Sequence, residues 1–130
     1  LVLVDSALTL HLTPGHSDGT LSLVFDVGVV GRPHRAMLWG GTAFNFGRDL
    51  PRLESYIAST RRMAEVAEKT KVDVFISNHP SFDDSLAKME AMRQGGLSAH
   101  PFVIGNAAVL RSLQVMNECA QAQRDRFSFR

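Results

Sequence analysis

Two of the five histidines in this sequence lie where a side chain can do chemistry. His16 stands in the polar loop "TPGHSDGT", between two runs typical of strands, and His79 comes two residues after the apolar run "VDVFIS". A histidine just beyond a strand is held by the sheet and exposed by its loop, which is where α/β proteins place catalytic groups. Neutral imidazole is also the commonest metal ligand in proteins. Position alone leaves two interpretations open: metal ligands or ordinary loop histidines.

Three carboxylates lie close to these histidines in the sequence. Asp18 follows His16 by two residues. Asp83 and Asp84 follow His79 closely. A structural zinc site needs four protein ligands and a catalytic site three, so two histidines are too few. We nevertheless expect turn formation or helix capping for all three aspartates, and zinc bound by this chain alone is predicted to be weak or completed by a partner chain.

The other three histidines give weaker signals. His11 lies mid-strand on the polar side, and His34 follows a proline in a turn, so we expect both to face solvent or to be incidental. His100 precedes the last predicted helix, where a structural role is expected.

The tract "GGTAFNFG", residues 40–47, is the remaining candidate for a site. Glycines after a strand let the backbone approach a ligand closely, and phenylalanines can wall an apolar pocket. On this interpretation the substrate pocket is lined by Gly40, Gly41, Phe44 and Phe46. The alternative is that the two phenylalanines anchor the loop in the core.

The elements that must position these residues follow from the hydrophobic pattern. Apolar residues alternate with polar ones at Leu8, Leu10 and Leu12, and again at Leu21, Leu23 and Phe25. This period of two predicts two strands, each with one buried face. Residues 26–35, with three turn formers, are interpreted as a hairpin-type connection to a third strand, "RAMLWGG".

In the second half of the chain, the apolar residues recur at a helical spacing. Apolar residues three and four apart predict an amphipathic helix over 50–69, with Asp49 as its N-cap and Pro51 in its first turn. Residues 72–77 are interpreted as a buried strand, followed by a short helix with Leu86, Met89 and Met92 that ends at two glycines, and by a final helix over about 106–124. The order β-β-β-α-β-α-α predicts an α/β fold, a sheet covered by helices.

The composition of the chain limits the classes of function that it can have. At 130 residues, 45% hydrophobic and 21% charged, the chain is typical of a soluble globular protein with one domain or part of one. A net charge of +1 gives no basic stripe for nucleic acid, and no apolar run is long enough for a membrane span. The single cysteine, Cys119, excludes an internal disulfide and is expected to be a small buried side chain.

Two of these stretches resemble a known family. "TPGHSDGT" is similar to the "TPGHTxG(T/S)" segment of metallo-β-lactamase-fold hydrolases, and "VDVFISNHPSF" is similar to their later segment ending in His-Pro, above all in the lactamase subclass with nearly all-histidine zinc ligands. The resemblance implies that His16 binds the first zinc and His79 the second. It further implies hydrolysis of a small ester or amide by a metal-bound hydroxide.

The sequence also departs from this family. The family's principal metal motif, His-x-His-x-Asp-His, is absent, and Gly40 and Gly41 stand where many members carry a bridging aspartate. The resemblance therefore implies the C-terminal half of an αββα sandwich, with residues 1–130 as a single partial domain. The chain starts on a strand-like run without an initiator Met, which also leads us to expect a fragment.

Two functions follow as hypotheses. The first is the C-terminal part of a zinc-dependent hydrolase, inactive without the missing half, which would be periplasmic or secreted if lactamase-like and otherwise cytoplasmic. The second is a non-catalytic half-domain stabilised by self-association or by a partner chain. Half a sandwich leaves one sheet face and a strand edge uncovered, so we expect a homo-oligomer.

Overall fold

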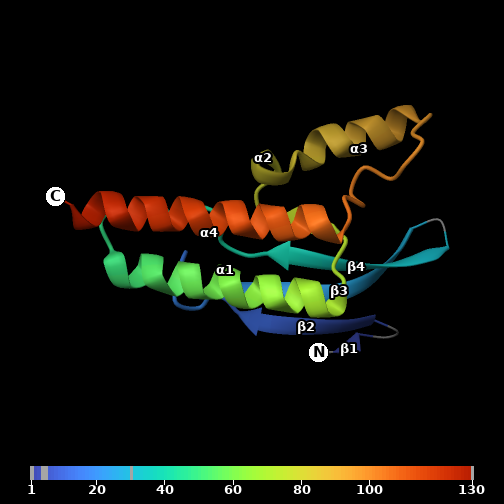
Figure 1. Cartoon of the computed structure of the whole chain (residues 1–130). Coiled ribbons are helices and arrows are strands. Elements are labelled where there is room, and N and C mark those ends of the chain that lie inside the picture. The colour runs from blue at the N-terminus through green and yellow to red at the C-terminus, as the bar shows by residue number, and fades with distance from the viewer. Residues whose placement is uncertain (1, 4–5, 30, 130) are drawn as a thin grey trace.

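The computed structural model describes residues 2–3, 6–29 and 31–129. In these residues one mixed sheet is covered on one face by two long helices (Figure 1). The strands are β1 (Val2–Leu3), β2 (Ser6–Leu12), β3 (Leu21–Val29), β4 (Arg32–Trp39) and β5 (Val74–Ser77). The helices are α1 (Leu50–Thr70), α2 (Pro80–Asp83), α3 (Ser85–Gln94) and α4 (Asn106–Ser128). The predicted α/β order is confirmed, with β1 and the single turn of α2 in addition.

The topology of the sheet places the loops after three of its strands at one edge. Its strand order is β1-β2-β3-β4-β5, antiparallel from β1 to β4, with β5 parallel to β4. Strands β2, β4 and β5 therefore run in the same direction and end at the same edge. The loops that follow them carry every site residue predicted above.

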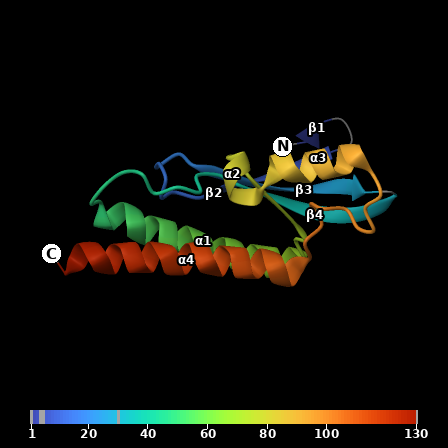
Figure 2. The ribbon, with the colours of Figure 1, turned by 90° about the horizontal axis from the view of Figure 1, so that it is seen from above.

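Helices α1 and α4 lie side by side on one face of the sheet (Figure 2). The predicted capping of α1 is confirmed, because the Asp49 side chain accepts a hydrogen bond from the Arg52 amide at 3.0 Å and a proline stands in the first turn. The apolar stripes of both helices meet the sheet in one core. Its largest fully buried side chains are Trp39, Tyr56, Met37, Leu53, Ile57, Met63 and Leu113.

The leucine-rich faces of β2 and β3 point away from this core. Val24 and its cross-strand neighbour Met37 are buried under the helices. Leu10, Leu12 and Leu21, on the opposite face, are 46%, 53% and 45% exposed. The prediction that these alternating leucines form a buried face is wrong for this chain, because alternation shows which residues share a face and not what covers it.

We call this second side of the sheet the outer face. Cross-strand pairing aligns its side chains in rows, such as Leu10 with Leu23 and Leu38 with Ile76. Neither α1 nor α4 covers it. Its members in β2 to β5 include Leu8, Leu10, Leu12, Leu21, Leu23, Phe25, Leu38 and Ile76.

Two further predictions need correction. Residues 26–29 and 32–35 belong to β3 and β4, which remain paired as far as Val29 and Arg32. Cys119 is exposed on α4. Helix α3 forms as predicted and ends at Gly95, but it buries none of its residues, and Leu86 is 69% exposed. None of the described helices is long and apolar enough to cross a membrane.

His11 is not a solvent-facing histidine. It pairs across the sheet with the buried Ser22, and its Nε2 atom is buried without a hydrogen-bond partner among the described residues. Burial, together with the positive charge of Arg62 on α1, lowers the pKa of His11. The folded protein therefore favours the neutral ring.

We expect stability to fall below about pH 6.5 as the unfolded chain takes up a proton on His11 that the folded chain resists. A group whose pKa is lower in the folded state makes the free energy of unfolding rise with pH. His11→Leu should flatten that dependence between pH 5 and 7.5, measured by urea unfolding. An equal pH dependence in both proteins would contradict this assignment.

Candidate functional site

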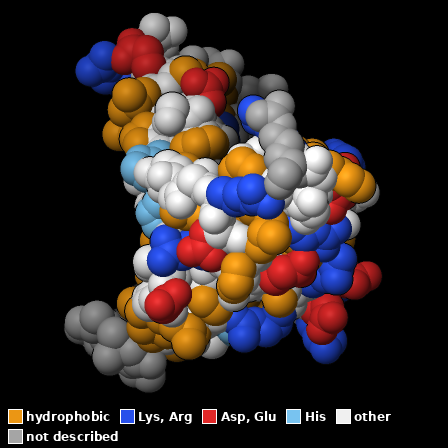
Figure 3. Space-filling model, turned by 90° about the vertical axis from the view of Figure 1, so that its left-hand side faces the viewer, with side chains coloured by type: hydrophobic (Ala, Val, Ile, Leu, Met, Phe, Trp, Pro, Cys, Tyr) orange, Lys and Arg blue, Asp and Glu red, His pale blue; other side chains and the backbone are white. Residues whose placement is uncertain are grey.

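The common edge of β2, β4 and β5 gathers three loops. Residues 13–20 follow β2, residues 40–49 follow β4, and residues 78–79 follow β5. Figure 3 views the molecule from this end, and histidine side chains are visible together on its surface.

The loop after β2 is closed at its base by buried polar groups. The Thr13 amide donates to the Thr20 carbonyl at 2.7 Å, and the Thr13 hydroxyl lies 2.9 Å from that of Ser22. The Ser22 hydroxyl in turn accepts from the Gly40 amide at 3.1 Å. Thr13 and Ser22 are both buried, so this network ties the loop to the end of β4.

One ring nitrogen of His16 is already engaged. Its Nδ1 atom lies 2.6 Å from the carbonyl oxygen of Ala43. A carbonyl only accepts, so Nδ1 carries the proton, and in the neutral ring the lone pair is therefore on Nε2. A histidine held in this way is oriented as metal-ligating histidines are, with the backbone carbonyl fixing the tautomer.

The glycines after β4 are required by this loop. A Cβ atom on Gly40 would lie 2.0 Å from the Leu21 carbonyl oxygen. One on Gly41, where φ is +75°, would lie 2.4 Å from the Cβ of His16. Close packing of the chain against itself therefore accounts for both glycines. That they also line a substrate pocket remains a prediction.

The turn that carries His79 is held by Asp83. One carboxylate oxygen of Asp83 accepts from the Ser77 amide at 2.7 Å, and the other accepts from the amide of Ser85 at 3.0 Å and from its hydroxyl. Burial alone would raise the pKa of Asp83, but the hydrogen bonds from Ser85 and Ser77 outweigh it and lower the pKa. The expected structural role of Asp83 is confirmed, since it joins β5 to the start of α3.

The two histidine loops meet the same stretch of chain. Thr42 and Ser77 share a hydrogen bond between their hydroxyls at 2.8 Å, and the Ser77 hydroxyl accepts from the His79 amide at 3.2 Å. Ala43, next to Thr42, is the partner of His16. Both predicted ligands therefore flank residues 42–43 at one edge, His16 half-buried and His79 exposed.

The described residues do not complete a metal site. No group of three or more His, Cys, Asp or Glu side chains that could hold a metal ion is found among them. The free Nε2 of His16 and the exposed ring of His79 suit a metal, but two nitrogens fall short of the three or four protein ligands that zinc takes. The donor set is therefore partial.

Phe44 and Phe46 pack against the core instead of standing free. The ring of Phe44 meets that of Tyr56 edge to face at 5.2 Å, and the guanidinium of Arg52 lies 5.1 Å from the centre of the Phe46 ring. A cavity of about 680 Å³ lies near this edge. Thr42 is the residue of the tract 40–47 that lines it, and none of the four predicted pocket residues does so.

Sequence reasoning missed the residue that joins these loops, Tyr56 on α1. Its hydroxyl donates to the Thr42 carbonyl at 2.9 Å, and its side chain lies against Gly15, where a Cβ would be 2.6 Å from the Cβ of Tyr56. Burial raises the pKa of Tyr56 to about 12. A lone tyrosine in a helical stripe carries no sequence signal of this role.

The fold of this chain is shared with solved proteins. BJP-1, a subclass B3 metallo-β-lactamase of Bradyrhizobium japonicum, matches 98% of this chain with a TM-score of 0.76 and 23% identity. Native FEZ-1 metallo-β-lactamase from Legionella gormanii matches 98% with a TM-score of 0.78 and 21% identity. The chain covers only 48% and 49% of these two proteins. The fold is that of half a metallo-β-lactamase.

The same half is found in LRA-12, a class B3 di-zinc metallo-β-lactamase from an Alaskan soil metagenome, with a TM-score of 0.63 and 17% identity over 98% of this chain. This chain spans 47% of LRA-12. No family model matches the sequence, and no curated protein sequence matches it. The metallo-β-lactamase fold is thus established by structure and not by sequence similarity.

Because the Gly41 contact fixes His16, Gly41→Ala should displace the ring and lower the free energy of unfolding by about 1–3 kcal/mol. Gly47→Ala is the matched control, since Gly47 has nearly the same φ, +72°, and nothing lies within 4 Å of a Cβ there. Urea unfolding gives the stability, and the imidazole NMR signals of His16 report its surroundings. Equal stability of the two variants, with unchanged His16 signals, would contradict the contact.

Proposed function

We propose that this chain is the C-terminal half of a zinc-dependent hydrolase with the metallo-β-lactamase fold, and that it is inactive alone. The observation that carries the proposal is the placement of His16 and His79 around residues 42–43, in a fold that matches about half of several metallo-β-lactamases. The name of LRA-12 specifies two zinc ions, which supports zinc for the complete site.

In this proposal His16 and His79 supply two of the metal ligands, and the other ligands come from the half that this chain does not contain. A zinc ion held there would supply Lewis-acid chemistry for the hydrolysis of a small ester or amide. Gly40, Gly41, Phe44 and Phe46 then form the rim of the substrate pocket.

The test is zinc binding by the isolated chain. We expect weak binding in calorimetry, lost in both His16→Ala and His79→Ala and kept in the control His100→Ala. The isolated chain should leave a chromogenic β-lactam unhydrolysed at every zinc concentration. Zinc-dependent hydrolysis by the chain alone would refute the claim that it is inactive, and binding unaffected by either substitution would refute the ligand assignment.

A second candidate, a non-catalytic half-domain stabilised by self-association, is favoured by the outer face. Its rows of apolar side chains include three leucines about half exposed. A second copy is the occupant that we propose, because the apolar rows of β2 and β3 can pack against themselves about a two-fold axis and aligned sheets pack face to face. The part of BJP-1 that this chain leaves uncovered is also about as long as one further copy.

We expect a dimer by light scattering at micromolar concentration and a monomer for Leu12→Glu, which places a charge on the outer face. Leu86→Glu is the matched control, since Leu86 is an exposed leucine on α3. A wild-type monomer at high concentration, or dissociation by Leu86→Glu alone, would contradict an interface at the outer face.

A further inference from the structure

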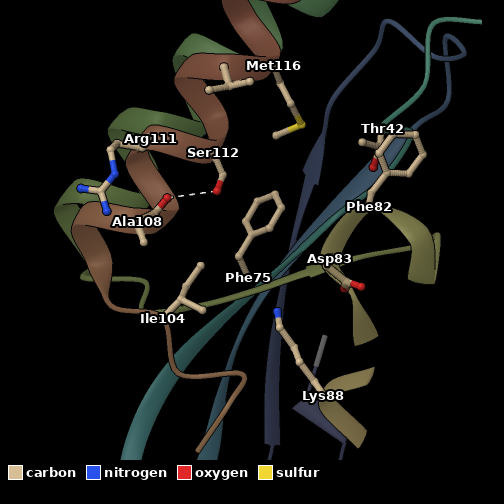
Figure 4. A pocket seen from close by; sticks show the side chains of 11 residues that line it. Thr42, Phe75, Phe82, Asp83, Lys88, Ile104, Ala108, Arg111, Ser112 and Met116 are labelled. Atoms are coloured by element: carbon tan, nitrogen blue, oxygen red, sulfur yellow. Dashed lines mark hydrogen bonds between the residues drawn. The ribbon is translucent and has the colours of Figure 1, made fainter. Parts of the chain in front are cut away.

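The cavity near the common edge is a slot between α4 and the α2–α3 segment. Its volume is about 680 Å³, within the range that holds drug-sized ligands. In Figure 4, Phe75 of β5 lies between the α4 side chains Ser112 and Met116 and the α2 side chain Phe82. The lining is mainly apolar.

The polar groups of the wall are satisfied within the protein. Ser112 donates to the Ala108 carbonyl at 3.0 Å, and Thr42 is engaged with Ser77. Both oxygens of Asp83 accept hydrogen bonds. None of these groups needs a ligand.

Lys88 differs from these groups. Its side chain extends from α3 with the nitrogen toward the cavity (Figure 4). Its positive charge contributes to the lowered pKa of the nearby Asp83, but it forms no close ion pair with a carboxylate of the described residues. The nitrogen lies 5.2 Å from the centre of the Phe102 ring, which holds the charge beside an apolar surface. Arg111 also lines the cavity, but its guanidinium points away from it (Figure 4), so Lys88 supplies the cation of this wall.

We propose that this cavity binds an amphipathic monoanion, an apolar chain with one carboxylate. The apolar body lies along Phe75, Phe82 and Met116, and the carboxylate accepts hydrogen bonds from the Lys88 ammonium. Among the described lining residues Asp83 is the one carboxylate, and its two oxygens accept hydrogen bonds from the Ser77 and Ser85 amides, so the ammonium donors of Lys88 remain available to the ligand. This site is separate from the two histidines, so it stands or falls independently of the hydrolase proposal.

Decanoate tests the proposal, with decanol as its uncharged analogue. Lys88→Met should weaken decanoate binding about ten- to a hundredfold in calorimetry and leave decanol binding unchanged, because only the carboxylate uses the ammonium. Lys69→Met, on the exposed last turn of α1, is the control and should bind as the wild type does.

Ala108→Trp fills the slot and should abolish binding of both compounds. Ala107→Trp, its neighbour outside the lining, is the matched control. Amide NMR shifts in the unsubstituted chain should map decanoate to Phe75, Ala108 and Ser112, a readout that needs no variant to fold. The proposal is overturned if the shifts map instead to β2 and β3, which would mean adsorption on the outer face, or if decanoate does not bind or binds equally to the Lys88→Met protein.

Discussion

Tyr56 is the residue on which the arrangement of the site depends. Its hydroxyl donates to the Thr42 carbonyl, and its ring meets Trp39 and Phe44 edge to face. The backbone of Gly15 passes so close to it that no side chain fits. One buried aromatic on α1 therefore holds the loop after β2 and the loop after β4 against the same helix. His16 is placed by both loops, and the second loop places Ser77 through Thr42.

The outer face imposes a second constraint, because it exposes apolar side chains to water. A sheet that is covered by helices on one side and carries leucines on the other exposes apolar surface to water, which is unfavourable until something covers it. The edge that carries the two histidines holds no group of three or more potential metal ligands among the described residues. An apolar face left uncovered on one side of the sheet is expected of half of a four-layer αββα sandwich.

Much of the fold could be predicted from the sequence because local signals agreed with it. The apolar spacing along α1, the Asp49 cap and the glycine at the end of α3 each specify an element without long-range information. Alternation in β2 and β3 predicted strands but assigned burial to the wrong face. Which face is covered depends on where α1 and α4 pack, and that lies beyond any local pattern.

The candidate site, like the fold, could be predicted from the sequence only in part. His16 and His79 could be singled out because each follows a strand, and the parallel directions of β2, β4 and β5 bring them to one edge. The roles of Tyr56, Thr42 and Ser77 could not be predicted, because they arise from contacts between residues far apart in the chain. The need for Gly41 likewise appears only when the His16 side chain is seen beside it.

The fold brings His16 and His79 to one edge, with His16 in the Nδ1-protonated form, and we propose that the two rings bind one metal site there. Long-range ¹H–¹⁵N NMR spectra of the imidazole rings during a zinc titration test it most directly. We predict that both Nε2 signals shift together at the same zinc concentration, and that His16 shows the Nδ1-protonated tautomer before zinc is added. Signals that shift at different zinc concentrations, or only one ring responding, would contradict the account.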